Sequence, residues 1–396
     1  MAYTGFKVQG ADLGDMYLTY ADLAQYYPQM VGGAKASSAT AAGVMNGSTF
    51  SGNAPNANSI INSTANPQID RVFAGENVGA YIKTDGSLWM WGTNASGRIG
   101  DGTSTSKSSP VQVFGGQKWL SVAMAKDSTV AIRADRTLWG WGGYSWFLPG
   151  NALSFHSSPV QILAGSTGWK EVEVDNTNGV AAAIKTDGTL WTWGADSFGG
   201  LGHNTLASSS SPAQIFGGGT NWKNVTVRFG GGTAIKTDGT LWSWGYNSAG
   251  ELGDNTTVQK SSPVQTIAGG TNWKQVVTPG QEINGGMVLA LKTDGTLWTW
   301  GGRFGATASF SSPVQILSNN RWAEVFGSGA PINGFAAARS VDGNIWRWKA
   351  LGTGTSTTPS PSIVSPRIGY RWMQFAVVGG DAEGGYLGTH DTTLSS

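Results

Sequence analysis

The sequence predicts an all-β fold, a seven-bladed β-propeller built from a repeat of about 50 residues. Three observations lead to this prediction. A Trp pair returns at a regular interval, an Asp-Gly turn precedes nearly every pair, and residues 68–396 show no helical period. Many short, evenly spaced strand units are typical of a propeller.

The Trp pair marks each repeat. The string Leu-Trp-x-Trp begins at Leu88, Leu138, Leu190, Leu241 and Leu297, and Ile345 opens a sixth copy. A further Trp stands upstream of most pairs, at Trp119, Trp169, Trp222, Trp273, Trp322 and Trp372. Of the 19 Trp residues, only Trp146 lies outside these positions. Rings that follow the period of the repeat are expected to pack between neighbouring sheets.

A β-hairpin is predicted around each pair. Asp238-Gly239 precedes one Leu-Trp-x-Trp strand, and glycine accepts the positive φ that a tight hairpin turn requires. The two Trp residues are two positions apart, so both should face the same side of the sheet. Arg136 replaces the glycine after Asp135, and we expect a different turn or strain there.

The ring should close where the two ends of the repeat region meet. The last unit stops at Leu394, before any Trp pair, and we expect residues 58–67 to add the missing strand to the last blade. The predicted domains are an N-terminal docking arm and linker at 1–57 and a propeller at 58–396, with repeats at 68–396. A β-solenoid is the alternative, but it would require shorter and more uniform units.

Two repeats carry a longer motif. Trp-Gly-x-Asn-x-x-Gly-x-Leu-Gly-Asp ends at Asp254, and a copy with Ile in place of Leu ends at Asp101. This pattern resembles the regulator-of-chromosome-condensation repeat family over residues 68–396, and the resemblance implies a seven-bladed propeller of four-stranded blades. The motif is degraded after Trp141 and lost after Trp300 and Trp348, so these loops should differ in shape. Nucleotide exchange does not carry over, because no acidic cluster is visible.

Residues 1–57 differ from the repeats. Residues 11–30 are rich in Tyr, Leu and Met, whereas 31–58 are mostly small and polar, as in an extended linker. Asp22 can cap a helix and Pro28 would end it, so the arm is predicted to be extended, with or without a short helix. Its large side chains either pack on the propeller or dock into another protein. These side chains are Tyr17, Leu18, Tyr20, Leu23, Tyr26, Tyr27 and Met30.

Composition and motifs argue against catalysis. Charged residues make up 12% of the chain and the net charge is +1, so the basic footprint of a nucleic-acid-binding protein is missing. His156, His203 and His390 are the three histidines, and they occupy unrelated repeat positions, so no metal site is expected. No phosphate loop or nucleophile motif is present, and we expect no cofactor and no enzyme activity. No apolar run is long enough to predict membrane insertion.

A docking arm, a linker and a rigid head together predict a structural and display protein of a bacteriophage particle. The chain lacks the basic start and apolar core of a signal peptide, so we expect synthesis in the host cytoplasm and localisation to the virion. Residues 1–57 would bind other virion proteins of the tail, baseplate or capsid, with several copies of the chain per particle.

The propeller would bind protein partners or a host-surface receptor through its irregular loops. The candidate contacts are Trp146, Phe147, Phe155, Arg303 and Phe304. The aromatic side chains among them would otherwise fill the gap that a degraded loop leaves. The alternative function is a cellular scaffold or a guanine-nucleotide-exchange-type propeller that binds a protein partner. An enzyme such as a glycan lyase is a third reading, disfavoured because no catalytic set is visible.

Overall fold

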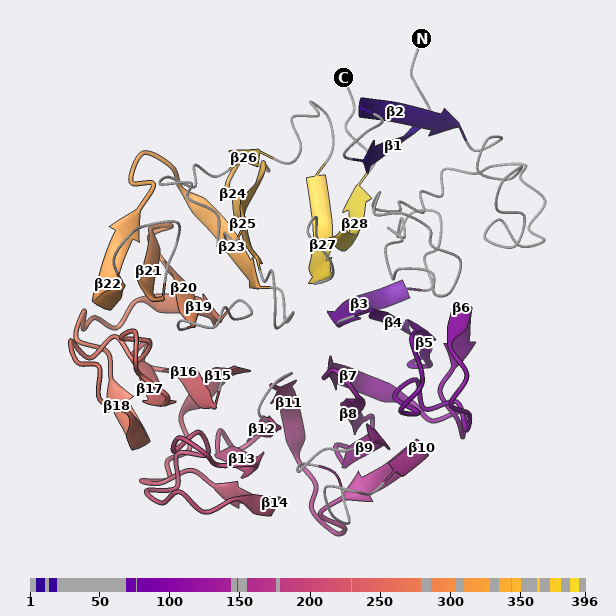
Figure 1. Ribbon diagram of the computed structural model, residues 1–396, viewed down its shortest axis with the longest axis horizontal. Coiled ribbons are helices and arrows are strands. Elements are labelled where there is room, and N and C mark those ends of the chain that lie inside the picture. Colours follow the sequence, from indigo (N-terminus) through magenta and orange to yellow (C-terminus); the bar gives the residue numbers. More distant parts are fainter. Residues whose placement is uncertain are drawn as a thin grey trace.

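The computed structural model describes residues 5–10, 14–19 and 69–391, the last range with gaps at 76, 144–147, 149–154, 176–178, 229, 279–285, 303–308, 328–334, 343, 350–361, 364–370 and 379–384. Throughout this described part the chain forms strands and turns and no helix. The all-β prediction is confirmed there. Figure 1 shows the sheets arranged side by side around a central axis.

The first three sheets each contain four antiparallel strands in chain order. The first comprises β3 (Ile69–Gly75), β4 (Val78–Lys83), β5 (Leu88–Gly92) and β6 (Lys107–Gln112). The second comprises β7 (Trp119–Met124), β8 (Ser128–Arg133), β9 (Leu138–Gly143) and β10 (Phe155–Ile162). The third comprises β11 (Trp169–Val174), β12 (Val180–Lys185), β13 (Leu190–Gly194) and β14 (Ser209–Gln214).

The next three sheets repeat this arrangement. The fourth comprises β15 (Trp222–Arg228), β16 (Gly231–Lys236), β17 (Leu241–Gly245) and β18 (Lys260–Gln265). The fifth comprises β19 (Trp273–Val277), β20 (Met287–Lys292), β21 (Leu297–Gly301) and β22 (Phe310–Ile316). The sixth comprises β23 (Trp322–Gly327), β24 (Phe335–Ser340), β25 (Ile345–Lys349) and the short β26 (Ser362–Ile363).

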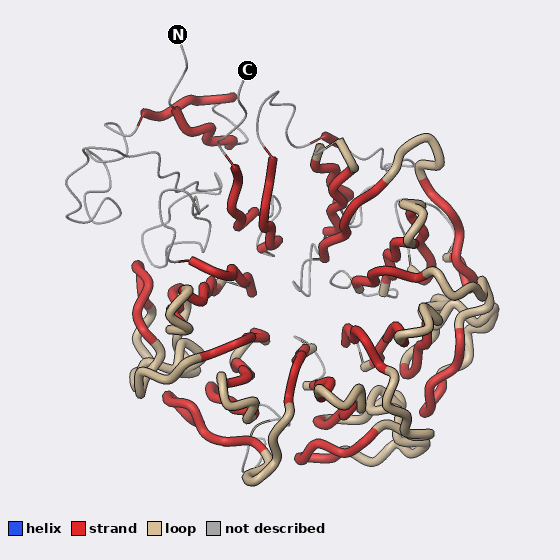
Figure 2. The backbone as a smooth tube through the Cα atoms, turned by 180° about the vertical axis from the view of Figure 1, so that it is seen from behind, coloured by secondary structure: helices blue, strands red, loops and turns tan. Residues whose placement is uncertain are grey.

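Two further sheets have two strands each. β27 (Arg371–Val378) pairs with β28 (Gly385–Asp391), and β1 (Gly5–Gly10) pairs with β2 (Gly14–Thr19). β27 lies beside β23 on one side and β3 on the other, so the last sheet joins the first. In Figures 1 and 2 the first strand of each propeller sheet lies nearest the axis. The predicted helix after Asp22 and the predicted closing strand at 58–67 lie outside the described residues.

The Asp-Gly turns form as predicted. Gly188 has a φ of +80° and donates its N–H to the Lys185 carbonyl at 2.9 Å. A Cβ on Gly188 would lie 2.0 Å from the Thr220 carbonyl oxygen of the next sheet, so only glycine fits. Arg136 keeps the same turn, with a φ of 65° and its N–H bonded to the Arg133 carbonyl at 2.9 Å. The strain predicted there is therefore present, because a non-glycine residue in this region costs about 1–2 kcal/mol.

The Trp rings lie between neighbouring sheets, as predicted. One core cluster combines Leu138 and Ile162 of the second sheet with Trp169, Val172 and Trp193 of the third. Each of four other core clusters likewise combines residues of two neighbouring sheets. Each upstream Trp in them, and the second Trp of most pairs, is at most 3% exposed: Trp119, Trp169, Trp222, Trp273, Trp322, Trp91, Trp141, Trp193, Trp244 and Trp300.

Both Trp residues of a pair lie on one face of their strand. The ring of Trp169 contacts Trp191 and Trp193, with centroid distances of 6.0 and 6.4 Å. Their depths differ, however, because Trp193 is buried and Trp191 is half-buried. Buried indoles also connect sheets by hydrogen bonds. Trp244 Nε1 donates to the Gly200 carbonyl of the preceding sheet at 2.9 Å, and Trp141 and Trp300 donate in the same way.

Candidate protein-interaction surfaces

The propeller has two ends that differ in structure. We call the end with the Asp-Gly turns the turn face; it contains residues 85–86, 135–136, 187–188, 238–239 and 294–295. We call the opposite end the loop face; it contains the long loops 93–106, 195–208 and 246–259, between the third and fourth strands of their sheets. The repeat motifs place half-buried Trp residues with Asp and Lys or Arg at the turn face, and loops organised by a buried Asn or Asp at the loop face.

At the turn face the half-buried Trp is held in a polar array. Trp191 Nε1 donates to the Thr189 hydroxyl at 2.8 Å, which in turn donates to the Asp187 carboxylate at 2.7 Å. Lys185 Nζ lies 4.7 Å from the centroid of the Trp191 ring. The Thr189 hydroxyl and N–H lower the pKa of Asp187, so the carboxylate is held ionised beside the lysine.

The array repeats around the face. Ser or Thr accepts an indole N–H from the half-buried Trp, and a cation lies over its ring. The hydroxyl residues are Ser87, Thr137, Thr189, Thr240 and Thr296. The cations are Lys83, Arg133, Lys185, Lys236 and Lys292. In the second to fifth sheets the aspartate of the turn also interacts with the cation of its own array, whereas Asp85 of the first sheet pairs with Lys118.

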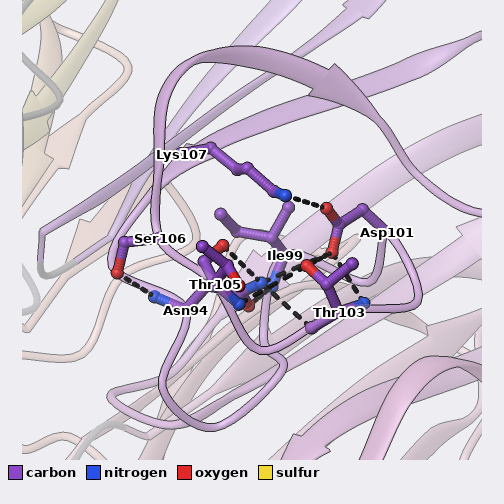
Figure 3. A network of polar contacts seen from close by, with 7 residues as sticks. All are labelled: Asn94, Ile99, Asp101, Thr103, Thr105, Ser106 and Lys107. Carbon is purple, nitrogen blue, oxygen red and sulfur yellow. Dashed lines mark hydrogen bonds and ion pairs between the residues drawn. The ribbon is translucent and has the colours of Figure 1, made fainter.

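A buried asparagine organises the first loop of the loop face, as Figure 3 shows. Asn94 Oδ1 accepts the Ile99 N–H at 2.9 Å, while Asn94 Nδ2 donates to the Thr103 and Thr105 carbonyls at 3.1 and 3.2 Å. Asn247 repeats this pattern with Leu252, Thr256 and Val258. Asp101 accepts the Thr103 N–H at 3.0 Å, so the aspartate of the motif caps a turn within the loop.

The third sheet departs from this pattern. Asp196 stands where the other loops have asparagine, and His203 stands where they have Asp101 or Asp254. Asp196 is 4% exposed, and the backbone N–H groups of Gly199, Gly200 and Leu201 lie around its carboxylate. Burial raises the pKa of Asp196 and lowers that of His203. Aligning the repeats would have revealed this exchange, but the histidine alone did not suggest it.

The His203 ring is itself held by the protein. The Thr192 hydroxyl donates to the Leu201 carbonyl at 2.5 Å, so it accepts the N–H of His203 Nε2 at 2.9 Å.

Among the described residues no group of three His, Cys, Asp or Glu side chains could hold a metal ion. The described residues also include no helix of the length and apolarity needed to cross a bilayer.

Polar side chains join the inner strands near the axis. The Gln275 amide donates to the Val325 carbonyl at 2.8 Å and accepts the Val325 N–H at 3.1 Å, as a strand residue would. Glu171 occupies the equivalent position in the third sheet and accepts the Val225 N–H at 3.2 Å. Burial raises the pKa of Glu171 to about 7. These side chains therefore connect the inner strands of neighbouring sheets and serve the fold.

Of the predicted surface contacts, only Phe155 is described. It begins β10, pairs with Gly143 and is 46% exposed, and its ring lies over Gly97 and Gly143. Trp146, Phe147, Arg303 and Phe304 lie outside the described residues. The five contact residues therefore stay a prediction.

The predicted docking arm is described in part. Tyr17 and Leu18 lie in β2, where they pair with Lys7 and Phe6 of β1. Within the described residues, β1 and β2 thus form an antiparallel pair where the sequence predicts an extended arm. Tyr20, Leu23, Tyr26, Tyr27 and Met30 lie outside the described residues.

Comparisons with known proteins identify the repeat. Residues 85–132, 187–234 and 238–280 match the regulator of chromosome condensation (RCC1) repeat. The Ultraviolet-B receptor UVR8 of Arabidopsis thaliana is 26% identical over 50% of this chain and 46% of its own length. E3 ubiquitin-protein ligase HERC2 of Homo sapiens is 26% identical over 53% of this chain and 4% of its own length.

A third relative is the mitochondrial RCC1 domain-containing protein RUG3 of A. thaliana. It is 26% identical over 67% of this chain and 62% of its own length. The match to each of these three relatives thus spans less than two thirds of the relative's length.

Solved structures show the same fold. Human WBSCR16 aligns with a TM-score of 0.63 at 16% identity and covers 78% of this chain and 84% of its own. Prp20p of Saccharomyces cerevisiae aligns with a TM-score of 0.63 at 15% identity and covers 79% of this chain and 80% of its own. At such identities the likeness establishes the fold alone. The chain carries RCC1 repeats and has an RCC1-like propeller fold.

The prediction of a bacteriophage virion protein is wrong, and so is the predicted virion localisation. The relatives that share the repeats are cellular proteins of plants and mammals, and one is mitochondrial by name. Many of the chain's glycines serve tight turns of the propeller, where Gly86, Gly188, Gly239 and Gly295 all have positive φ.

Proposed function

We propose that the chain is a cellular scaffold that binds a protein partner through a face of its propeller and catalyses no reaction. One observation carries this proposal. Residues that recur in the repeat motif are already bonded inside the fold: Trp244 connects two sheets and Asn94 holds its loop. The repeated side chains that remain exposed lie at the two ends of the ring, and a rigid propeller can present such ends to a protein partner.

The relatives support a binding role. UVR8 is named as a receptor, and the structure of Prp20p is described with its binding properties to Gsp1p and histones. A second Prp20 structure contains bound Kap60. HERC2 is a ligase, but the match covers 4% of its length. We do not propose nucleotide exchange, because similarity to Prp20p at 15% identity concerns the fold.

We further propose that the ring has seven blades. Six sheets have four strands, and β27 with β28 would form the inner half of a seventh between the sixth sheet and the first. Residues 58–67 would supply an outer strand of this blade, and residues 1–57 would lie outside the propeller domain. Such closure removes the free edges that otherwise favour aggregation.

Two truncations test this closure. A chain that begins at residue 58 should unfold at the same temperature as the full chain, because the ring is complete. A chain that begins at residue 68 should unfold several degrees lower, about 2–4 °C per kcal/mol lost, because an outer strand is missing. Equal melting temperatures for the two truncations, measured by differential scanning calorimetry, would contradict the closing strand.

The binding role is tested with the full chain in the cells that make it. A tagged chain is purified at physiological salt and its mass is measured by native mass spectrometry. We expect a complex of defined stoichiometry with at least one other protein. Recovery of the chain alone across the concentrations found in the cell would contradict the proposal.

A further inference from the structure

Five links cross the turn face from the outer strand of one sheet to the inner strand of the next. They comprise residues 113–118, 163–168, 215–221, 266–272 and 317–321. Their position at the turn face is fixed by hydrogen bonds: Trp222 N–H, at the end of one link, donates to the Gly188 carbonyl of the neighbouring turn at 3.0 Å, and Trp273 N–H donates to Gly239 at 3.1 Å.

Each link begins with a large apolar residue at or next to its first position. These residues are Phe114, Leu163, Phe216, Ile267 and Leu317. Phe114, Phe216 and Ile267 are 61%, 53% and 56% exposed, whereas the residue before each of them is buried. Their backbone N–H groups donate to the carbonyls of Gly100, Gly202 and Gly253, so each of these residues lies where the outer end of a link meets the long loop of its own sheet, with its side chain exposed. Single exposed apolar side chains are common, but the same position on successive sheets of one face is not random scatter.

A cation stands next to the Trp that opens each inner strand. Lys118 and Arg321 precede this Trp at the end of a link, and Lys170, Lys223 and Lys274 follow it as the second residue of the strand. We call these five exposed residues the link cations. Among the described residues, no carboxylate forms an ion pair with Lys170 or Lys223. Asp135, Asp187, Asp238 and Asp294 each interact with the lysine or arginine of their own Trp array, whereas Asp85 pairs with Lys118 at 3.6 Å. The links therefore give the turn face an excess of positive charge.

The loop face lacks this excess. Its charged side chains include the carboxylates Asp101, Asp127, Asp196, Glu251 and Asp254 and the cations Arg98, Lys107, Lys126 and Lys260. Lys107 is paired with Asp101 at 2.9 Å. Arg98 is buried and bonds the Thr93 carbonyl at 2.8 Å. Positive charges that look scattered along the sequence are thus gathered at one end by the period of the repeat.

We propose that the turn face docks an acidic protein segment that carries apolar side chains. This proposal rests on the proposed binding function and names the face and the chemistry of the partner. Acidic side chains would meet the link cations near the axis, and apolar side chains would cover Phe216, Ile267 and their equivalents. A nucleic acid fits less well, because the ionised Asp187, Asp238 and Asp294 on the same face would repel a continuous phosphate backbone.

The test measures binding of a fluorescein-labelled peptide of alternating Glu-Glu and Leu-Leu pairs by fluorescence anisotropy. The full chain should bind it with an affinity that falls as salt is raised. Lys170→Glu combined with Lys223→Glu should weaken binding about ten-fold or more. Phe216→Ser combined with Ile267→Ser should weaken binding without changing the salt dependence.

Lys126→Glu is the matched control, because it makes the same charge change at an exposed position of the loop face. It should leave binding unchanged. Equal loss with Lys126→Glu, or no loss with the double lysine variant, would overturn the docking surface. Tighter binding of a 20-base-pair DNA duplex than of the peptide would overturn the class of partner.

The two proposals fail separately. If the complex purified from cells survives the double lysine variant unchanged, the binding function stands and the turn face is not the docking surface. If the wild-type chain is recovered alone, the binding function itself fails. Circular dichroism of each variant at the temperature of the assay checks that the propeller is intact.

Discussion

The third sheet and its neighbours place different groups at equivalent positions. Asp196 stands where the first and fourth sheets have Asn94 and Asn247, and Glu171 stands where the fifth has Gln275. The surrounding backbone is the same. The N–H of Asp196 is bonded to the Ser208 hydroxyl at 3.0 Å, as that of Asn94 is to Ser106 at 3.2 Å. Asp196 therefore replaces an amide that the first and fourth loops share, and Glu171 replaces the amide of the fifth sheet at a position where the sixth sheet also has an acid, Glu324.

The difference concerns what each group can donate. An amide donates through its nitrogen and accepts through its oxygen, so Asn94 and Gln275 satisfy carbonyls and N–H groups together. An ionised carboxylate only accepts, and it gains a donor only when it is protonated. The stability of the third sheet should thus depend on pH through Asp196 and Glu171, whereas the amides Asn94, Asn247 and Gln275 at the equivalent positions do not titrate.

The largest effect is expected when an amide loop is given the acid. Asn247→Asp should lower the free energy of unfolding by about 3 kcal/mol at pH 8, because a buried carboxylate would face the Thr256 and Val258 carbonyls. Guanidinium denaturation followed by Trp fluorescence measures the loss. Asn255→Asp, an exposed change in the same loop, is the control and should cost little. A similar loss of unfolding free energy in both variants would mean that any added negative charge destabilises the loop, whether it is buried or exposed.

The next effect concerns the axis. The pKa of Glu171 is raised from 4.5 to about 7 in the folded protein, so its stabilising contribution is complete below 4.5 and is lost as the pH rises through about 7. Glu171→Gln should therefore stabilise the protein at pH 8, by on the order of 2 kcal/mol, and have no effect near pH 4. Denaturation curves at several pH values measure this dependence.

A second variant separates charge from position. Glu324 is the equivalent residue of the sixth sheet and pairs with Arg339 at 3.3 Å. Glu324→Gln should not stabilise the protein at any pH, because it removes an ion pair. Equal stabilisation by both changes would show that glutamine is simply preferred on this strand.

A smaller gain is expected when the third loop is given the amide. Asp196→Asn should raise the free energy of unfolding by about 1 kcal/mol, because the new amide can donate to carbonyls as Asn94 does. The pKa of Asp196 is raised in the folded state, so the wild-type contribution is lost as pH rises and the gain should be larger at pH 8 than at pH 5. Thermal unfolding at the two pH values gives the comparison, and a gain independent of pH would contradict it.

The smallest effect concerns the one turn that lacks glycine. Arg136→Gly should stabilise the protein by about 0.5–1 kcal/mol, because it relieves the left-handed φ of 65° but adds freedom to the unfolded chain. Arg136→Ala is the matched control, since it keeps the strain while removing the side chain. If alanine stabilises as much as glycine, the side chain and not the backbone is responsible.

Much of the fold could be predicted because the same sequence pattern occurs in each of several repeats. The Trp period indicates buried rings, and the Asp-Gly pairs indicate hairpins wherever Gly86, Gly188, Gly239 and Gly295 allow a positive φ. The different depths of Trp191 and Trp193 could not be predicted, because both lie on one face and only the neighbouring sheet decides which is covered. The antiparallel pair of β1 and β2 has no repeat to reveal it.

The candidate surface was harder to predict. Lys170, Lys223 and Lys274 look isolated in the sequence, and only the closed arrangement of sheets gathers them at one end. Phe155 was chosen because it breaks the repeat, whereas Phe216 and Ile267 are exposed at positions that follow it. The irregular residues predicted one surface, and exposed residues at regular positions such as Phe216 and Ile267 suggest another.

Cross-linking of the chain in its native complex tests most directly whether the turn face is where partners bind. A lysine-specific reagent can react at both ends, since Lys118, Lys170, Lys223 and Lys274 lie at the turn face and Lys107, Lys126 and Lys260 at the loop face. Cross-links to the partner, mapped by mass spectrometry, should involve the first four. Partner cross-links confined to Lys107, Lys126 and Lys260 would contradict the account.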